Sequence, residues 1–166
     1  DQLIDNQIKV QNSEAAYIRA RENLDVVKNQ AQSDLDKAEL ALRFAKQDLT
    51  KYVEGEYPKE LNESESRITV AKEELNRAEE KLKWSQKLFD EKYLSGTELR
   101  ADALAAKKAE LDLDLAENNL KLLKEYTYTR TLAELESEVK QSGMALERAK
   151  RKATADVIQA EAELRA

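Results

Sequence analysis

The chain has 166 residues, of which 37% are charged and 5% are aromatic, so a large apolar core around an enclosed substrate pocket is excluded. The net charge of −6 argues against nucleic acid as a partner, because that affinity comes mainly from lysine and arginine. The absence of histidine and cysteine excludes the commonest nucleophile–base pairs and the nitrogen–sulfur zinc sites.

Four helical segments are predicted from apolar residues that recur at steps of three and four, the pattern of a coiled-coil seam. The first two seams run through Tyr17, Ala20, Leu24, Val27, Ala31, Leu35, Ala38, Leu42, Ala45, Leu49 and Tyr52, and through Leu61, Ser64, Ile68, Ala71, Leu75, Ala78, Leu82, Ser85 and Phe89. The last two run through Ala109, Leu113, Ala116, Leu120 and Leu123, and through Leu132, Leu135, Val139, Ser142, Leu146, Ala149, Ala153, Val157, Ala160 and Leu164. Neither end carries a helix-stop signal, so we expect residues 1–166 to be a helical domain excised from a longer protein.

The same apolar pattern occurs twice, in an internal repeat that spans roughly residues 35–82 and 106–153. Lys37–Leu49 (KAELALRFAKQDL) in the first copy matches Lys108–Leu120 (KAELDLDLAENNL) in the second. Each copy is a helix, a tyrosine-marked interruption and a second helix, and such a unit can bury its seam only against another. The repeat therefore indicates an architectural role.

The interruptions are predicted near Gly55–Pro58 and near Tyr126–Thr129. In the first copy the flanking seam residues, Tyr52 and Leu61, are nine residues apart, which is about two and a half α-helical turns. A straight helix would present its seam on the opposite face beyond that gap, so the chain is expected to reverse, kink or change partners there. Gly55 suits the end of a helix and Pro58 the start of one, whereas Thr131–Glu134 has the spacing of a capping box.

Two all-α architectures are compatible with this pattern. The first is a long antiparallel coiled-coil helical hairpin with its tip near Tyr93–Gly96, where Ser95 and Glu98 have capping-box spacing. The two interruptions would then lie at similar heights on facing arms, and tyrosines would fill the gap where the seam changes face. These tyrosines are Tyr52, Tyr57, Tyr126 and Tyr128. The second architecture is a four-helix antiparallel bundle with turns near Gly55, Ser95 and Thr127.

Catalysis is not indicated by any residue pattern. Adjacent carboxylates such as Glu73 and Glu74 point about 100° apart on a helix and do not converge on a substrate. The basic run Arg148–Lys152 is interpreted as a solvated helix face, and no stretch approaches the roughly 20 apolar residues of a membrane helix. We therefore predict a non-enzyme with no catalytic, cofactor-binding or metal-binding residues.

Around the predicted tip the sequence resembles the periplasmic adaptor proteins, the HlyD-type membrane fusion proteins of tripartite efflux and secretion systems. Their hairpin turn follows roughly the pattern L-(Y/F)-x-x-G-x-I-S-x-x-E-L-D, and Leu88–Arg100 has the sequence LFDEKYLSGTELR. Many adaptors also carry an Arg–Leu–Ser set at this tip, and Leu88 and Ser95 match its last two positions. Trp84 stands at the arginine position, Lys92 where glycine is usual, and Arg100 where aspartate is usual.

The resemblance implies a structural adaptor segment that links an inner-membrane transporter, of the ABC or RND type, to a TolC-like outer-membrane channel. It also implies self-association into a ring (trimer to hexamer) in the periplasm, with the full-length protein anchored to the inner membrane by regions outside this chain. The tip would dock on the channel. The residues expected at this partner-docking tip are Trp84, Leu88, Phe89, Tyr93, Leu94, Ser95, Glu98 and Leu99.

Other interpretations stay open. Trp84 and Tyr93 either contact a channel or a neighbouring copy, or they pack on the flank of the hairpin. The tyrosines at the interruptions could instead form an aromatic cage for a ligand. Acidic, repeated helices also suit a cytoplasmic coiled-coil scaffold or tether with no transport role. A peripheral membrane-remodelling protein is a further alternative, although the chain lacks a strongly amphipathic basic helix.

Overall fold

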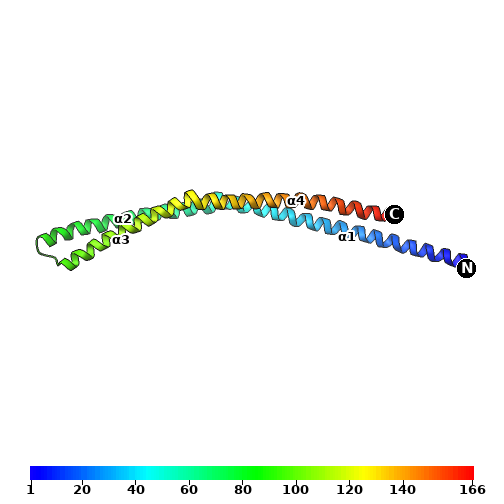
Figure 1. The fold of residues 1–166 in the computed structure, drawn as a ribbon, viewed down its shortest axis with the longest axis horizontal. Coiled ribbons are helices and arrows are strands. Elements are labelled where there is room, and N and C mark those ends of the chain that lie inside the picture. Colours follow the sequence, from blue (N-terminus) through cyan, green and yellow to red (C-terminus); the bar gives the residue numbers. More distant parts are fainter. The chain divides into compact units, whose positions relative to one another are not determined.

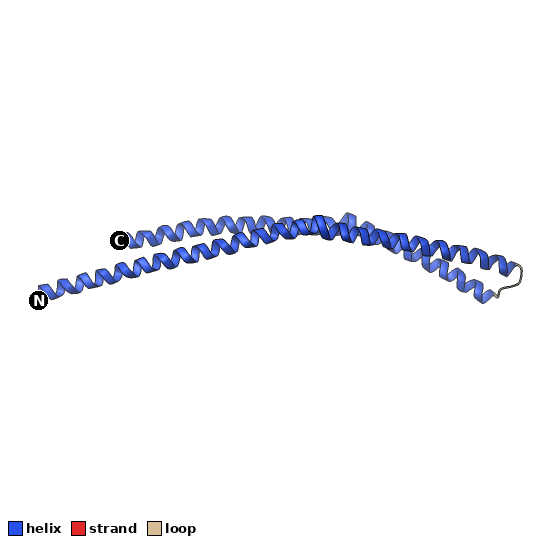
Figure 2. Cartoon of the chain, turned by 180° about the vertical axis from the view of Figure 1, so that it is seen from behind, coloured by secondary structure: helices blue, strands red, loops and turns tan.

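The computed structural model describes all of residues 1–166, and every regular element in it is helical (Figure 2). In chain order the elements are α1 (Gln2–Lys51), η1 (Tyr52–Glu56), α2 (Tyr57–Asp90), α3 (Gly96–Leu122), η2 (Leu123–Thr127) and α4 (Tyr128–Arg165). They join into two continuous helices of 89 and 70 residues. The predicted all-α helical hairpin is confirmed. The four-helix bundle is wrong, because the chain stays helical through Gly55 and Thr127.

The hairpin divides into two compact units. The terminal unit contains residues 1–49 and 135–166, and the tip unit contains residues 50–134. In the terminal unit α1 lies beside α4, and in the tip unit α2 lies beside α3 (Figure 1). Each unit buries a narrow strip of side chains between two helices rather than a broad core.

The core of the terminal unit consists of leucine and alanine side chains from the predicted seams. Leu24 and Ala45 of α1 are buried, as are Leu146, Ala153 and Ala160 of α4. Alanine lets two helices approach closely, but it removes little apolar area from water. The apolar stabilisation of this unit therefore depends strongly on its few buried leucines.

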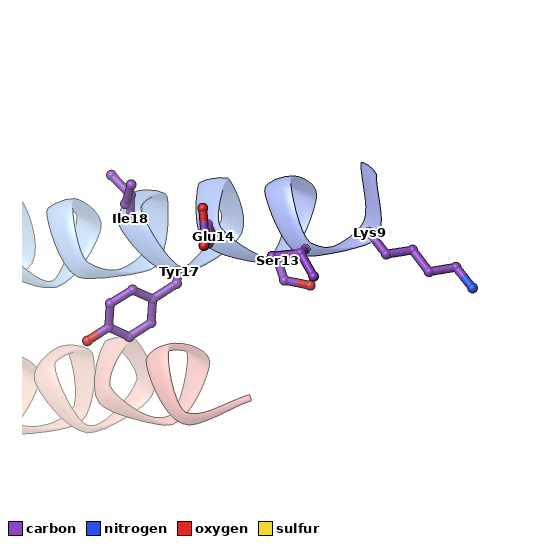
Figure 3. A pocket seen from close by; sticks show the side chains of 6 residues that line it. Lys9, Ser13, Glu14, Tyr17 and Ile18 are labelled. Atoms are coloured by element: carbon purple, nitrogen blue, oxygen red, sulfur yellow. The ribbon is translucent and has the colours of Figure 1, made fainter. Parts of the chain in front are cut away.

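Tyr17 does not belong to the buried seam, contrary to the prediction. Its side chain is about half exposed, although its ring lies over the last turns of α4 (Figure 3). The covered part of the α1 seam thus begins at Ala20, which is half-buried.

Each tyrosine-marked interruption is a five-residue π-helical segment inside a continuous helix. The Tyr57 N–H donates to the Tyr52 carbonyl, and the Tyr128 N–H donates to the Leu123 carbonyl, so these hydrogen bonds span five residues instead of four. Tyr52 and Leu123, where the two segments begin, are equivalent positions in the two copies of the repeat. The interruptions are where they were predicted. Their interpretation as helix ends is wrong, because Gly55 ends no helix and Thr131 caps none.

The local sequence explains why the helix widens at these two places. Pro58 lies in the first turn of α2, has no N–H to donate, and in a regular α-helix would clash with the carbonyl four residues earlier. In the second copy the Thr129 hydroxyl donates to the Glu125 carbonyl at 3.4 Å. The aromatic and β-branched run Tyr126–Thr129 is also a poor α-helix former. Different residues therefore favour the same irregularity in the two copies.

The π segments keep the seam on one face of the helix. Tyr57 is half-buried five residues after Tyr52, and half-buried Leu61 follows four residues later. Tyr128 is likewise half-buried five residues after Leu123. The predicted change of face is therefore wrong, since it assumed α-helical geometry through a gap that contains a π-helical step of five.

Residues 91–95 form the turn at the tip, where the prediction placed it. The Tyr93 N–H donates to the Leu88 carbonyl at 2.8 Å, and the Lys92 N–H donates to the Phe89 carbonyl at 2.9 Å, which is the pattern of a Schellman motif. Lys92 has a φ of 67°, in the left-handed region where glycine is the most favourable residue. The turn thus holds a lysine in a conformation that its side chain disfavours.

Lys92→Gly is expected to raise the free energy of unfolding by about 0.5–1 kcal/mol. The left-handed conformation costs a non-glycine residue about 1–2 kcal/mol, and the greater freedom of glycine in the unfolded chain offsets part of that gain. Urea denaturation of both proteins would measure the difference. Gly96→Ala is the matched comparison, because a Cβ there would meet the Phe89 ring at an ordinary 3.8 Å, and it should cost no stability. A Lys92→Gly protein no more stable than the parent would contradict this account of the turn.

Candidate functional site

The tip presents three aromatic side chains to solvent. Tyr93 is 77% exposed, Trp84 is 60% exposed, and Phe89 is exposed to a smaller degree. Lys87 Nζ lies 5.5 Å from the centre of the Trp84 ring, close enough for a weak cation–π attraction. The prediction that Phe89 belongs to the seam is wrong, because the seam continues from Ser85 to half-buried Leu88. Exposed aromatic rings beside a rigid turn are the part of the tip best suited to contact a partner.

Ser95 fixes the residue at which α3 begins. Its backbone is extended, with φ −74° and ψ 154°, and its hydroxyl oxygen accepts the Glu98 N–H at 3.2 Å. This bond is the first of the two that make up the predicted capping box. Glu98 is exposed in the first turn of α3, where the helix dipole favours a negative charge. Ser95 and Glu98 therefore order the turn.

The predicted leucines of the tip are partly covered. Leu88, Leu94 and Leu99 are each half-buried. Leu99 also lines a shallow groove of about 580 Å³ on the surface of the tip unit. The other residues of this groove, none of which belongs to the predicted site, are Glu79, Leu82, Lys83, Gln86, Arg100 and Ala103. Sequence reasoning did not include them in the site because they lie on α2 and α3 beyond the turn, with Leu82 assigned to the seam.

A polar layer interrupts the seam near the tip. The Ser85 hydroxyl donates to the Asp102 carboxylate, whose other oxygen lies 3.5 Å from Lys81 Nζ. The hydrogen bond from Ser85 is the main cause that lowers the pKa of Asp102. Partial burial opposes this effect, and the Lys81 charge reinforces it. The prediction missed Asp102 because its third seam began at Ala109. The available signal was the spacing of Asp102, four residues before buried Ala106. A polar pair at a seam position helps to fix helix register.

The tip unit is expected to lose stability as the pH falls through the folded-state pKa of Asp102. That pKa lies below the ordinary value of 3.8, so the unfolded chain binds the proton more readily. The stability that ionised Asp102 contributes is complete above pH 3.8 and is lost below the folded-state pKa. Urea denaturation between pH 6 and pH 2.5 should show that Asp102→Asn is less pH-dependent than the parent. Asp114→Asn, which changes an exposed aspartate on the same helix, should behave like the parent; equal slopes for Asp102→Asn and the parent would refute this assignment.

A tyrosine cluster lies within the tip unit where the two π segments end. The rings of Tyr57 and Tyr128 stack with their centroids 4.0 Å apart, and the Tyr52 centroid lies 6.3 and 6.0 Å from theirs. The prediction that the interruptions lie at similar heights on facing arms is thus confirmed. Tyr126, also predicted here, is 64% exposed and takes no part in these ring pairs. Because Tyr57 and Tyr128 pack directly on each other, their rings leave no space between them for a ligand.

The terminal unit has a second candidate, an open apolar groove of about 510 Å³ along α1. Figure 3 shows that the Tyr17 ring points toward α4, that Ile18 points away from it, and that Lys9 extends past the end of α4. These side chains do not converge on one point, so the groove has no focus for a small ligand. The chain holds no group of three or more histidine, cysteine, aspartate or glutamate residues placed to bind a metal ion. None of its helices has a stretch long and apolar enough to cross a membrane.

Comparison of the chain with protein-family models, with curated proteins and with solved structures finds no match. A functional assignment therefore depends on the geometry of the tip and on the sequence resemblance at Leu88–Arg100.

Proposed function

We propose that the chain is the structural adaptor segment of a tripartite efflux or secretion system. Its tip would meet a TolC-like outer-membrane channel, and the rest of the full-length protein would contact an ABC or RND transporter of the inner membrane. One observation carries the proposal: the backbone of the turn matches the residue types of the adaptor motif. Lys92, with its positive φ, stands at the glycine of the motif, and Ser95, the N-cap, stands at its serine.

The proposed mechanism is mechanical rather than chemical. Two paired helices hold the turn, and Trp84 on α2 and Tyr93 in the turn are exposed, large side chains with little conformational freedom to lose on binding. Several copies would stand side by side in a periplasmic ring of three to six, so that weak tip contacts add together. Energy for transport would come from the inner-membrane partner.

Binding to a purified TolC-like channel tests the proposal. The chain is immobilised at high density, so that neighbouring copies can engage one channel together, and binding is followed by surface plasmon resonance. Replacing both Trp84 and Tyr93 with alanine is expected to weaken binding at least tenfold, because exposed aromatic anchors often dominate protein interfaces. Trp84→Arg introduces the usual adaptor residue and should keep or improve binding.

The matched control is Val26→Ala, which removes an exposed apolar side chain from the terminal unit and should leave channel binding unchanged. Two outcomes would defeat the proposal. One is the absence of channel binding at 100 µM protein, and the other is binding that survives loss of both aromatic residues. The first result would favour a coiled-coil scaffold or tether with no transport role, and the second would show that Trp84 and Tyr93 do not form the contact with the channel.

A further inference from the structure

A second row of leucines runs along α3, apart from the seam. Leu104, Leu111, Leu115 and Leu122 are between 52% and 70% exposed, although leucine is usually buried. No other part of the tip unit covers them. The row includes none of the predicted tip residues, so a role for it does not depend on the proposed function.

The four leucines share one face of the helix. At 100° per residue, Leu111 and Leu115 lie about 20° to either side of Leu104 around the helix axis. Leu122 has the same angular position as Leu104, five turns further along the helix. Buried Ala106 and Ala109 lie on the opposite side of the helix, at about 200° and 140°. The row is therefore a second seam that faces away from α2.

Two polar residues complete the heptad spacing of this second seam. Lys108 and Asn118 fall between the leucines, so the row Leu104, Lys108, Leu111, Leu115, Asn118, Leu122 advances by steps of 4-3-4-3-4. Both polar side chains are exposed, and Lys108 forms no ion pair within the chain. A single lysine or asparagine at such a position commonly selects how two helices pair.

The repeat shows that the hairpin does not need these leucines at the ends of the row. At the offset of the repeat, Ser33, just before the first copy, corresponds to Leu104, and Lys51 in the first copy corresponds to Leu122. The helix there is equally regular up to its π segment. The complete row is thus a property of α3 alone, and a role in folding does not account for it.

We propose that a second copy of this chain pairs with this row through its own row, in antiparallel orientation about a two-fold axis. Centred between Leu111 and Leu115, such a pair places Leu104 against Leu122 and Leu111 against Leu115. It also sets each Lys108 opposite an Asn118, whose amide oxygen can accept from the ammonium group. Pairing of two rows in the same direction would bring Lys108 against Lys108, a repulsion of like charges. The pattern therefore selects the antiparallel dimer, in which the two tips point in opposite directions, so this dimer is an assembly distinct from the ring of the proposed function.

The contact is small. From Leu104 to Leu122 the helix extends about 27 Å, which gives an interface at or below the lower end of the range for stable complexes. A dimer with a dissociation constant in the tens to hundreds of micromolar is expected, and sedimentation equilibrium between 10 and 500 µM would detect it.

The double variant Leu104→Ser, Leu122→Lys copies the first repeat and should weaken the dimer at least tenfold. Val26→Ser changes an exposed residue of the terminal unit and should leave the dissociation constant of the dimer unchanged.

Orientation is tested without removing any leucine. Asn118→Lys sets lysine against lysine in the antiparallel pair and should weaken it. Adding Lys108→Asn restores a lysine–asparagine pair and should recover the parent dissociation constant. Unfolding in urea, followed for each variant, shows whether a loss of dimer reflects a loss of fold.

Cross-linking gives an independent readout, because the chain has no cysteine of its own. A mixture of Leu104→Cys and Leu122→Cys chains should form a disulfide between the two variants on oxidation. Preferential cross-linking of Leu104→Cys with itself would overturn the antiparallel arrangement. A monomer throughout the concentration range, or a dimer insensitive to the Leu104 and Leu122 substitutions, would overturn the proposal.

Discussion

Replacing Tyr52 with alanine is expected to lower the free energy of unfolding by about 3–5 kcal/mol, the usual cost of removing a large buried aromatic side chain. Tyr52 is 5% exposed and lies against Tyr57 and Tyr128 at the π segments. Its loss would leave a cavity between two helices that cannot move together freely, because Tyr57 and Tyr128 are already stacked. Equilibrium urea denaturation followed by circular dichroism would measure the change.

Tyr52→Phe is expected to raise the free energy of unfolding, whereas Tyr52→Ala lowers it. The Tyr52 hydroxyl is buried without a hydrogen-bond partner. Burial raises the pKa of this hydroxyl, and Thr131, which approaches it without forming a well-made hydrogen bond, offsets part of the rise. Removing an unpaired buried hydroxyl is expected to stabilise the protein by about 1 kcal/mol.

Tyr126→Ala is the matched control for Tyr52→Ala. A change above about 0.5 kcal/mol in its free energy of unfolding would contradict the view that only the buried tyrosine matters.

Leu24→Ala is expected to cost about 2–3 kcal/mol, because Leu24 is one of the two buried leucines of the terminal unit. The seam alanines nearby cannot collapse far enough to refill the space. Each unit packs mainly within itself, so the loss should appear as local opening. Amide hydrogen exchange in residues 1–49 and 135–166 should accelerate, while residues 50–134 keep their protection.

Val26→Ala, two residues away on the exposed face of the same helix, separates burial from helix propensity. It should leave both stability and exchange close to the parent values. Equal acceleration of exchange in both units after Leu24→Ala would contradict local opening and indicate a single cooperative unit.

The sequence was sufficient to predict the helices and the position of the turn at the tip, because these features depend on neighbouring residues, whereas it left open whether the chain forms a hairpin or a four-helix bundle. The heptad steps around Leu24 and Leu146 specify a buried face, and Ser95 specifies where α3 begins through a bond three residues away. The similar separations of the two interruptions from Ser95 also predicted that they would lie at similar heights in a hairpin, as the stacked Tyr57 and Tyr128 rings confirm.

Two features could not be predicted in this way. Steps of three and four are both allowed after Ser85, so local spacing alone did not decide whether Leu88 or Phe89 would be covered. The π segments depend on the facing arm as well as on local residues. Tyr57 can continue the seam in a step of five because Tyr128, on the other arm of the hairpin, packs against it. A nine-residue gap considered alone is compatible with a turn, a kink or a π-helical step.

The stacking of Tyr57 on Tyr128 limits how this chain can change its length during evolution. Adding or deleting one residue between Tyr57 and the turn would move one ring about 1.5 Å along the helix and 100° around it, away from its partner. The same change on the other arm cannot cancel the rotation, because it would turn the second ring as well. We expect homologous hairpins to differ between the stack and the tip by matched heptads, gained or lost on both arms together.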